Sequence, residues 1–165
     1  MPAVAGGTAK PLRFLAAPWL NRYAIKKGEV VKRTAECVCG EVTVEVEGDP
    51  KLHLVCNCNN CKKRTGSAFG VSAYFADSQV LAKNGSTITY EINNEETEQL
   101  RYFCKSCGTT LYWKISKFPG IPGVAEMTGV ASGCFTENPL PEPTMSALNN
   151  NKCAWLEFPE LKVVS

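Results

Sequence analysis

The segment Cys37-Val-Cys-Gly-Glu-Val-Thr-Val-Glu-Val-Glu47 places two closely spaced cysteines directly before a strictly alternating run. Val42, Val44 and Val46 fall on one side of an extended chain, which predicts a half-buried β-strand. The glycine after the second cysteine can adopt the positive φ that a tight metal-binding turn often needs. The segment therefore predicts a strand that is entered from a turn able to bind metal.

A second pair of cysteines, Cys104 and Cys107, lies far along the chain and is also followed by a glycine. Thiolate sulfur is a good ligand for zinc, which accepts four such ligands in a tetrahedral arrangement. We therefore expect Cys37, Cys39, Cys104 and Cys107 to hold one structural zinc ion. The alternative is that these are free buried thiols, which behave as small hydrophobic residues but require no paired spacing.

Three further cysteines lie within six residues, in the run Cys56-Asn-Cys58-Asn-Asn-Cys61. Three thiolates can hold one metal ion and leave its fourth position open, as is typical of catalytic zinc. Such an ion can bind a thiol, polarise a carbonyl or lower the pKa of a bound water. A closed structural site is the equal alternative, with a fourth ligand supplied by Cys134, Cys153 or His53.

Period-two patterns rich in β-branched and aromatic residues continue through most of the remaining chain. They predict strands at residues 71–76, 86–92, 99–103 and 109–115, with closing strands at 124–131 and 154–158. Residues 59–64 favour a short helical turn, and the proline- and glycine-rich stretches favour loops. We expect a mainly β fold, a single zinc-bound domain with long loops.

Charge is distributed unevenly along the 165 residues. Residues 1–28 carry five basic side chains and no acidic one, whereas residues 29–165 carry 13 basic and 16 acidic side chains, a net charge of −3. The main body therefore lacks the basic surface typical of nucleic-acid binding, and no apolar run approaches the roughly 18–20 residues that span a bilayer. We expect residues 1–30 to form a basic N-terminal extension that packs on a domain at residues 31–160.

The cysteines also indicate a compartment. Nine is an odd number, and the paired spacings favour metal ligands in a reducing environment over disulfide bonds. No secretory signal is recognisable, and the N-terminal segment lacks the serines of a mitochondrial transit peptide. We expect a cytoplasmic protein.

The three cysteine groups in this order, with Lys-Lys-Arg-Thr-Gly-Ser-Ala-Phe69 after the middle one, resemble the family of glutathione-dependent formaldehyde-activating (GFA) enzymes, which includes centromere protein V. The resemblance covers about residues 34–160 and implies a tent-like, mainly β fold for a GFA-like domain at residues 31–160. It implies two zinc ions per chain, a structural ion on the two pairs and a catalytic ion on Cys56, Cys58 and Cys61. The named activity of the family is a carbon–sulfur lyase-type reaction that joins glutathione and formaldehyde. Many members have histidine at the position of Asn57.

Two functions follow as hypotheses. The first is a zinc-dependent, carbon–sulfur lyase-type enzyme that acts on a small molecule, such as glutathione, a thiol adduct or another electrophilic metabolite. Asn57, Arg64 and Ser67 are then candidates to orient the substrate by hydrogen bonding, and the basic run at residues 62–64 could hold a substrate carboxylate. The second is a non-catalytic, zinc-stabilised binding module that contacts an anionic partner through the basic N-terminal arm. We expect neither a nucleic acid nor a membrane as partner.

Overall fold

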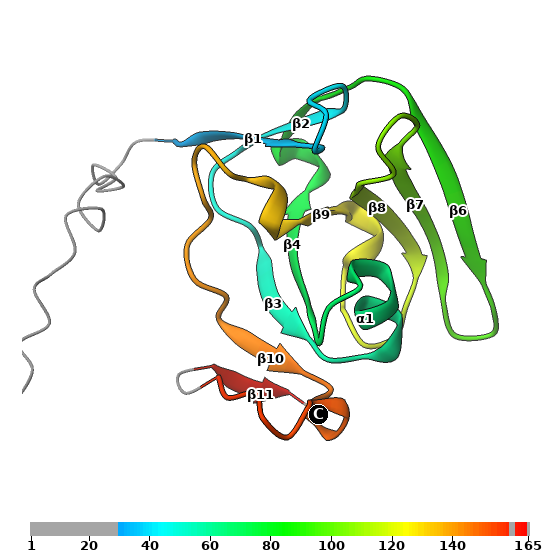
Figure 1. Ribbon diagram of the computed structural model, residues 1–165, viewed down its shortest axis with the longest axis vertical. Coiled ribbons are helices and arrows are strands. Elements are labelled where there is room, and N and C mark those ends of the chain that lie inside the picture. Colours follow the sequence, from blue (N-terminus) through cyan, green and yellow to red (C-terminus); the bar gives the residue numbers. More distant parts are fainter. Residues whose placement is uncertain (1–29, 159–160, 165) are drawn as a thin grey trace, which may run out of the picture.

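The computed structural model describes residues 30–158 and 161–164, and in this part of the chain it shows two β-sheets and one short α-helix (Figure 1). The smaller sheet has the strand order β1-β2-β5 and the larger one the order β11-β10-β3-β4-β9-β8-β7-β6. The prediction of a mainly β fold is confirmed. The elements are β1 (Lys32–Glu36), β2 (Thr43–Glu47), β3 (Leu52–Cys56), α1 (Asn59–Thr65), β4 (Gly70–Ala76), β5 (Val80–Asn84), β6 (Thr87–Asn93), β7 (Glu98–Cys104), β8 (Thr110–Lys117), β9 (Met127–Ala131), β10 (Met145–Ala147) and β11 (Lys162–Val164), with 3₁₀ turns at Asp77–Gln79, Val124–Glu126, Ser132–Cys134 and Asn149–Asn151.

The smaller sheet covers one face of the larger sheet. Val42, Val44 and Val46 have no exposed surface, as the alternation predicts, and they belong to one apolar cluster with Phe75 of β4 and Val130 of β9. Full burial of such side chains stabilises a fold by roughly 1.5–3 kcal/mol each. The alternating segment therefore forms the centre of the smaller sheet and joins the two sheets through a shared core.

The opposite face of the larger sheet carries a row of directly paired residues. Tyr74 of β4, Gly129 of β9, Trp113 of β8 and Arg101 of β7 lie opposite one another in successive antiparallel ladders. Directly paired residues project from the same face of a sheet. Helix α1 lies against this face, where the Arg64 guanidinium carbon is 4.5 Å from the centre of the Trp113 ring (Figure 1).

Gly129 makes room for the indole of Trp113. A Cβ atom at this position would lie 2.1 Å from Trp113 Nε1, far inside van der Waals contact. We expect Gly129→Ala to lower the free energy of unfolding by about 1–3 kcal/mol, because Trp113 must leave its packed position. Urea unfolding followed by circular dichroism measures this change. Gly133→Ala is the matched control, since a Cβ there meets nothing within 4 Å, and equal stability of the two variants would contradict the prediction.

The structure corrects two strand predictions. Residues 154–158 do not form a strand, because the chain turns there and the Leu156 amide donates a hydrogen bond to the Cys153 carbonyl oxygen at 3.0 Å. Trp155 in this segment is 74 % exposed. The strand expected at residues 124–131 begins only at Met127, after a 3₁₀ turn.

The basic N-terminal extension expected at residues 1–30 lies, except for Val30, outside the described residues. No helix in the described part of the chain is long and apolar enough to cross a bilayer.

Candidate functional site

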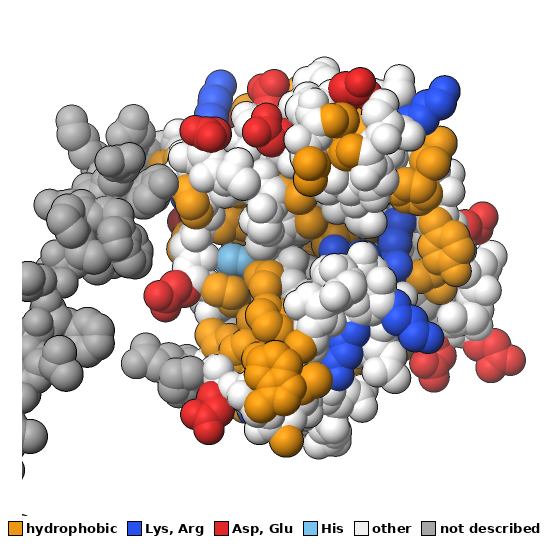
Figure 2. All heavy atoms as spheres, in the orientation of Figure 1, with side chains coloured by type: hydrophobic (Ala, Val, Ile, Leu, Met, Phe, Trp, Pro, Cys, Tyr) orange, Lys and Arg blue, Asp and Glu red, His pale blue; other side chains and the backbone are white. Residues whose placement is uncertain are grey.

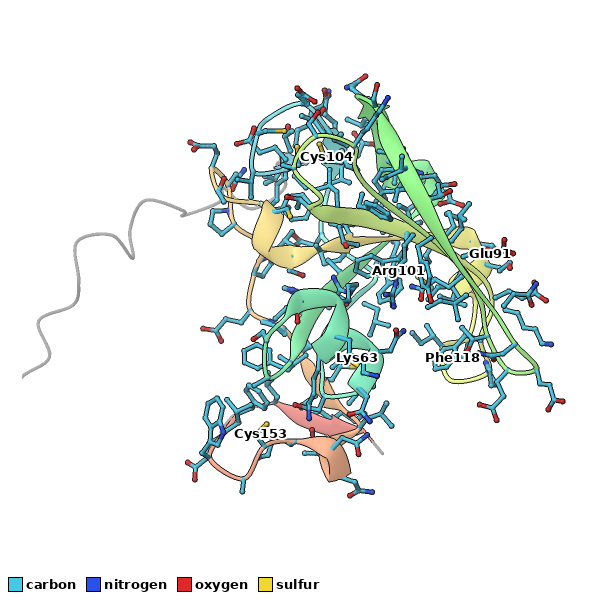
Figure 3. The ribbon with its side chains drawn as sticks, turned by 45° about the vertical axis from the view of Figure 1, so that its right-hand side comes forward. Lys63, Glu91, Arg101, Cys104, Phe118 and Cys153 are labelled. Atoms are coloured by element: carbon cyan, nitrogen blue, oxygen red, sulfur yellow. The ribbon has the colours of Figure 1, made fainter. Side chains whose placement is uncertain are left out.

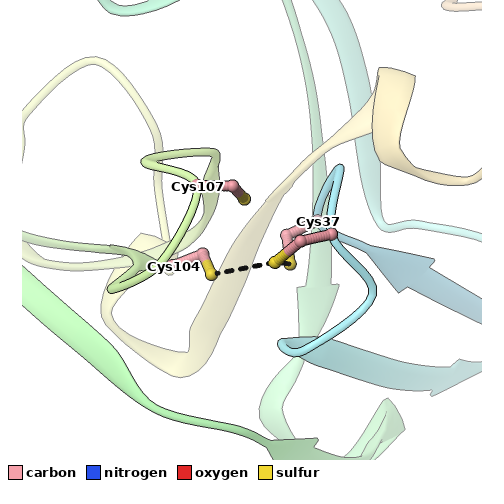
Figure 4. Close-up of side chains that lie close together, drawn as sticks. Cys37, Cys104 and Cys107 are labelled. Atoms are coloured by element: carbon pink, nitrogen blue, oxygen red, sulfur yellow. Dashed lines mark hydrogen bonds between the residues drawn. The ribbon is translucent and has the colours of Figure 1, made fainter.

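The two cysteine pairs meet at one end of the sheets. Cys37 and Cys39 lie in the turn between β1 and β2, while Cys104 ends β7 and Cys107 lies in the turn before β8 (Figure 4). All four sulfur atoms lie within 4.8 Å of one another, and Cys39 Sγ is 3.5 Å from Cys37 Sγ and 3.6 Å from Cys104 Sγ. Four sulfurs placed about 2.3 Å from a tetrahedral zinc ion would be about 3.8 Å apart. The residues predicted to form one site therefore come together with the spacing of a four-thiolate metal centre.

Backbone geometry at the two turns supports this centre. Gly40 has φ of 77° and Gly108 has φ of 73°, as the sequence predicts for the residue after each pair. The Val42 amide donates a hydrogen bond to Cys37 Sγ at 3.2 Å, which stabilises a thiolate. At the other turn, hydrogen bonds from the Thr109 hydroxyl and amide lower the pKa of Cys107 to about 5. Each turn therefore contains one sulfur, that of Cys37 or Cys107, whose ionised form is favoured by hydrogen bonds, and metal binding requires that form.

The three-cysteine group lies where β3 passes into α1. Cys56 ends β3, Cys58 is the N-cap of α1, and Cys61 lies in the first helical turn. Their sulfur atoms also lie within 4.8 Å of one another, so the group could hold a second metal ion. Cys58 Sγ accepts a hydrogen bond from the Cys61 amide at 3.2 Å. Hydrogen bonds from the Cys56 thiol, then from Cys61, lower the pKa of Cys58.

The three residues considered as a fourth ligand lie elsewhere. In the part of the chain that the structure describes, residues 30–158 and 161–164, no ligand atom of Cys134, Cys153 or His53 lies within 4.8 Å of all three sulfur atoms. The alternation of β3 explains the position of His53, because it projects from the face opposite to Cys56 and pairs with Ser132 Oγ at 3.0 Å. Among the described residues the group therefore offers three protein ligands, and a fourth ligand would have to come from outside this set.

Asn57 is fully buried beneath this group. Its amide nitrogen lies 3.2 Å from Ser146 Oγ, 3.0 Å from the Ala147 carbonyl oxygen and 2.9 Å from Asn149 Oδ1, all as acceptors. These hydrogen bonds fasten the metal loop to the segment at residues 146–149. Its Oδ1 atom is buried without a partner, and it is the only group of this side chain left to orient a ligand. A substrate contact for Asn57 stays a prediction.

The other two candidate residues differ in position. Arg64 lies against the larger sheet, over Trp113 and within 3.4 Å of Ser72 Oγ. Ser67 is exposed in the turn after α1, where its amide donates to the Thr65 hydroxyl at 3.3 Å. The structure thus places Arg64 on the face that carries the three-cysteine group, and the roles of Arg64 and Ser67 toward a substrate stay predictions.

Arg101 and Tyr74 extend the charged and polar surroundings of Arg64. Arg101 is only 8 % exposed, and the sequence patterns did not single it out. Burial lowers the pKa of Arg101, and the positive charge of Arg64 lowers it further. Burial raises the pKa of Tyr74 to about 12, so its phenol is protonated at neutral pH and can donate a hydrogen bond. No local sequence signal identifies Arg101, because its position opposite Trp113 depends on the pairing of β7 with β8.

The fold and the two cysteine groups define a class of protein: a mainly β domain that could hold two metal ions, one enclosed by four thiols and one bound by three. The sequence profile of the family described as "Glutathione-dependent formaldehyde-activating enzyme" matches residues 32–151. The chain therefore belongs to this family.

The chain is similar to several individual proteins. Proteins of Aspergillus flavus and Podospora anserina, both provisionally named glutathione-dependent formaldehyde-activating enzymes, are 32% identical over 82 residues and 31% identical over 87 residues. These matches cover 48% and 51% of this chain and 42% and 40% of the relatives, so the matched part spans less than half the length of those proteins. A crystal structure of a Rhodobacter sphaeroides protein aligns with a TM-score of 0.47 at 21% identity, over 64% of this chain and 88% of that one.

Proposed function

We propose that this protein is a zinc-dependent carbon–sulfur lyase-type enzyme that binds two zinc ions per chain and acts on a small thiol and an aldehyde, or on their adduct. The observation that carries the proposal is the three-cysteine group, which has no fourth ligand among the described residues. Glutathione and formaldehyde are the substrates that the family's name and the names of the relatives indicate. We propose them as the first pair to test.

The residues of the chain divide into two roles in this proposal. Cys37, Cys39, Cys104 and Cys107 hold the structural ion, and Cys56, Cys58 and Cys61 hold the catalytic one. When bound, the catalytic zinc supplies Lewis acidity that keeps a substrate thiol ionised or polarises a carbonyl. Asn57 fixes the metal loop through its hydrogen bonds to residues 146–149 and so keeps Cys56 and Cys58 in place.

The reaction of glutathione with formaldehyde is the addition of a thiol to a carbonyl group. The thiolate sulfur attacks the aldehyde carbon, a carbon–sulfur bond forms as the carbonyl π bond opens, and the resulting alkoxide takes up a proton. The thiol proton lost at the start balances this uptake. The product is an S-hydroxymethyl adduct, which is a hemithioacetal. The reverse reaction cleaves the same carbon–sulfur bond.

Exchange spectroscopy by nuclear magnetic resonance tests the proposal with the zinc-loaded full chain, glutathione and ¹³C-formaldehyde. Free and thiol-bound formaldehyde interconvert without an enzyme, so the expected result is an exchange rate that rises in proportion to protein concentration. Cys153→Ser, which changes a cysteine outside both groups, is expected to behave as the wild type. A rate that does not depend on the protein would refute the reaction with this pair and favour a zinc-stabilised binding module.

A further inference from the structure

Arg101 is a buried cation that has no anionic side chain as a partner within the described part of the chain. Its residue is 8 % exposed, its Nη2 donates to the neutral side chain of Gln99 at 3.3 Å, and its Nε has no partner. Arg33 provides a contrast within the same molecule, since it is also buried, with 2 % of its surface exposed, but pairs with Asp49 at 3.2 Å. A buried charge is costly unless an opposite charge compensates for it. Arg101 therefore lacks a counter-ion that the fold supplies elsewhere.

Arg64 adds a second positive charge to the same place. It stacks on Trp113, the residue that pairs directly with Arg101 in the ladder between β7 and β8. The ion pairs in the described part of the chain are Arg33–Asp49 and Lys114–Asp77, so neither arginine of this face has a carboxylate partner there. Figure 3 shows Arg101 on the side of the larger sheet where α1 lies. In Figure 2 basic side chains gather near the middle of this view, whereas several acidic ones lie at its rim.

The three-cysteine group balances only part of this charge. Three thiolates around a divalent ion carry a net charge of −1, whereas Arg64 and Arg101 carry +2. Before a substrate binds, one positive charge therefore remains at the site and attracts an anionic group of the substrate. The planar guanidinium group also fits a carboxylate through paired hydrogen bonds.

We propose that Arg101 and Arg64 together bind a carboxylate group of the substrate beside the three-cysteine group. The substrate class is then a small thiol that carries a carboxylate, or its aldehyde adduct. This inference rests on the proposed function, because it concerns the same site. The basic run at residues 62–64 contributes only Arg64, since Lys63 is exposed and Lys62 donates to the carbonyl oxygen of Asn151.

Calorimetric titration of the zinc-loaded full chain with two matched probes tests the proposal. The probes are 3-mercaptopropionate and 3-mercaptopropionamide, which differ in charge and scarcely in shape. We expect the wild type to bind the carboxylate about tenfold or more tightly than the amide, as is typical of a charge-assisted hydrogen bond. Arg101→Gln should abolish this preference and Arg101→Lys should keep part of it. Lys63→Gln removes one exposed charge from α1, the helix that carries Arg64, and should leave the preference unchanged.

Each outcome decides the question. Equal binding of the two probes by the wild type, or an unchanged preference in Arg101→Gln, overturns the proposal, as does tighter binding of inorganic phosphate. If Arg101→Gln does not fold, the partly exposed Arg64→Gln gives the answer, with the same loss expected. A carboxylate preference without any turnover of glutathione and formaldehyde would keep the carboxylate site and reject only the proposed reaction. Turnover of glutathione and formaldehyde without a carboxylate preference would keep the proposed reaction and reject the carboxylate site.

Discussion

Replacement of Cys104 with serine is expected to unfold the domain and to release the structural zinc ion. Cys104 has no exposed surface, and its sulfur lies 3.6 Å from Cys39 at the junction of the two sheets. Structural zinc contributes about 10–16 kcal/mol to folding in small zinc-dependent domains. Native domains are stable by only about 5–15 kcal/mol in total. Loss of one of the four thiolates should therefore exceed the available margin.

Metal analysis combined with circular dichroism checks this expectation. The Cys104→Ser variant should lose its β-sheet signal at 25 °C, or melt far below the wild type, and it should bind fewer zinc ions. Cys153→Ser is the control, because that cysteine belongs to neither group. A Cys104→Ser variant with two zinc ions and a melting temperature close to that of the wild type would show that the four-cysteine group does not hold the fold together.

Replacement of Cys58 with serine is expected to abolish turnover while the domain stays folded. Cys58 has two separate functions in the structure, as one sulfur of the three-cysteine group and as the N-cap of α1. Serine is a preferred N-cap residue, so it keeps the hydrogen bond from the Cys61 amide but loses the soft thiolate ligand. Loss of a hydrogen-bond partner of a metal ligand already costs roughly 10–100-fold in metal affinity or activity. Loss of the ligand itself should cost more than about a hundredfold in rate.

Cys58→Ala separates the cap from the ligand. Both variants should bind one zinc ion fewer than the wild type, and the alanine variant should be less stable than the serine variant by about 1 kcal/mol, the usual contribution of an N-cap. Zinc analysis, urea unfolding and the exchange assay measure the three quantities. Global unfolding of Cys58→Ser would identify the three-cysteine group as structural and would refute the open metal site.

Local patterns predicted most of the strands and both cysteine groups. Val42, Val44 and Val46 are buried because their spacing matches the period of a strand, and this relation involves no other part of the chain. The same holds for Cys56, Cys58 and Cys61, which one short loop and one helical turn bring together. By contrast, residues 154–158 have strand-forming composition, but a turn closed by the hydrogen bond from the Leu156 amide to the Cys153 carbonyl oxygen replaces the strand. Strand β5 (Val80–Asn84) was not expected, because its side chains show no clear alternation and its place depends on pairing with β2.

The cysteine spacings and the period-two runs thus established a mainly β domain with two groups of metal-binding thiols. Short-range geometry was sufficient there, since a turn or a strand forms from neighbouring residues. The remaining features depend on strand register. It places His53 on the face away from Cys56 and sets Arg101 opposite Trp113, under Arg64 and without a carboxylate partner. Contacts between residues distant in sequence follow from the order and pairing of whole strands. Among the described residues, the lack of a fourth ligand for the three-cysteine group and of carboxylate partners for Arg64 and Arg101 therefore became visible only in the folded chain.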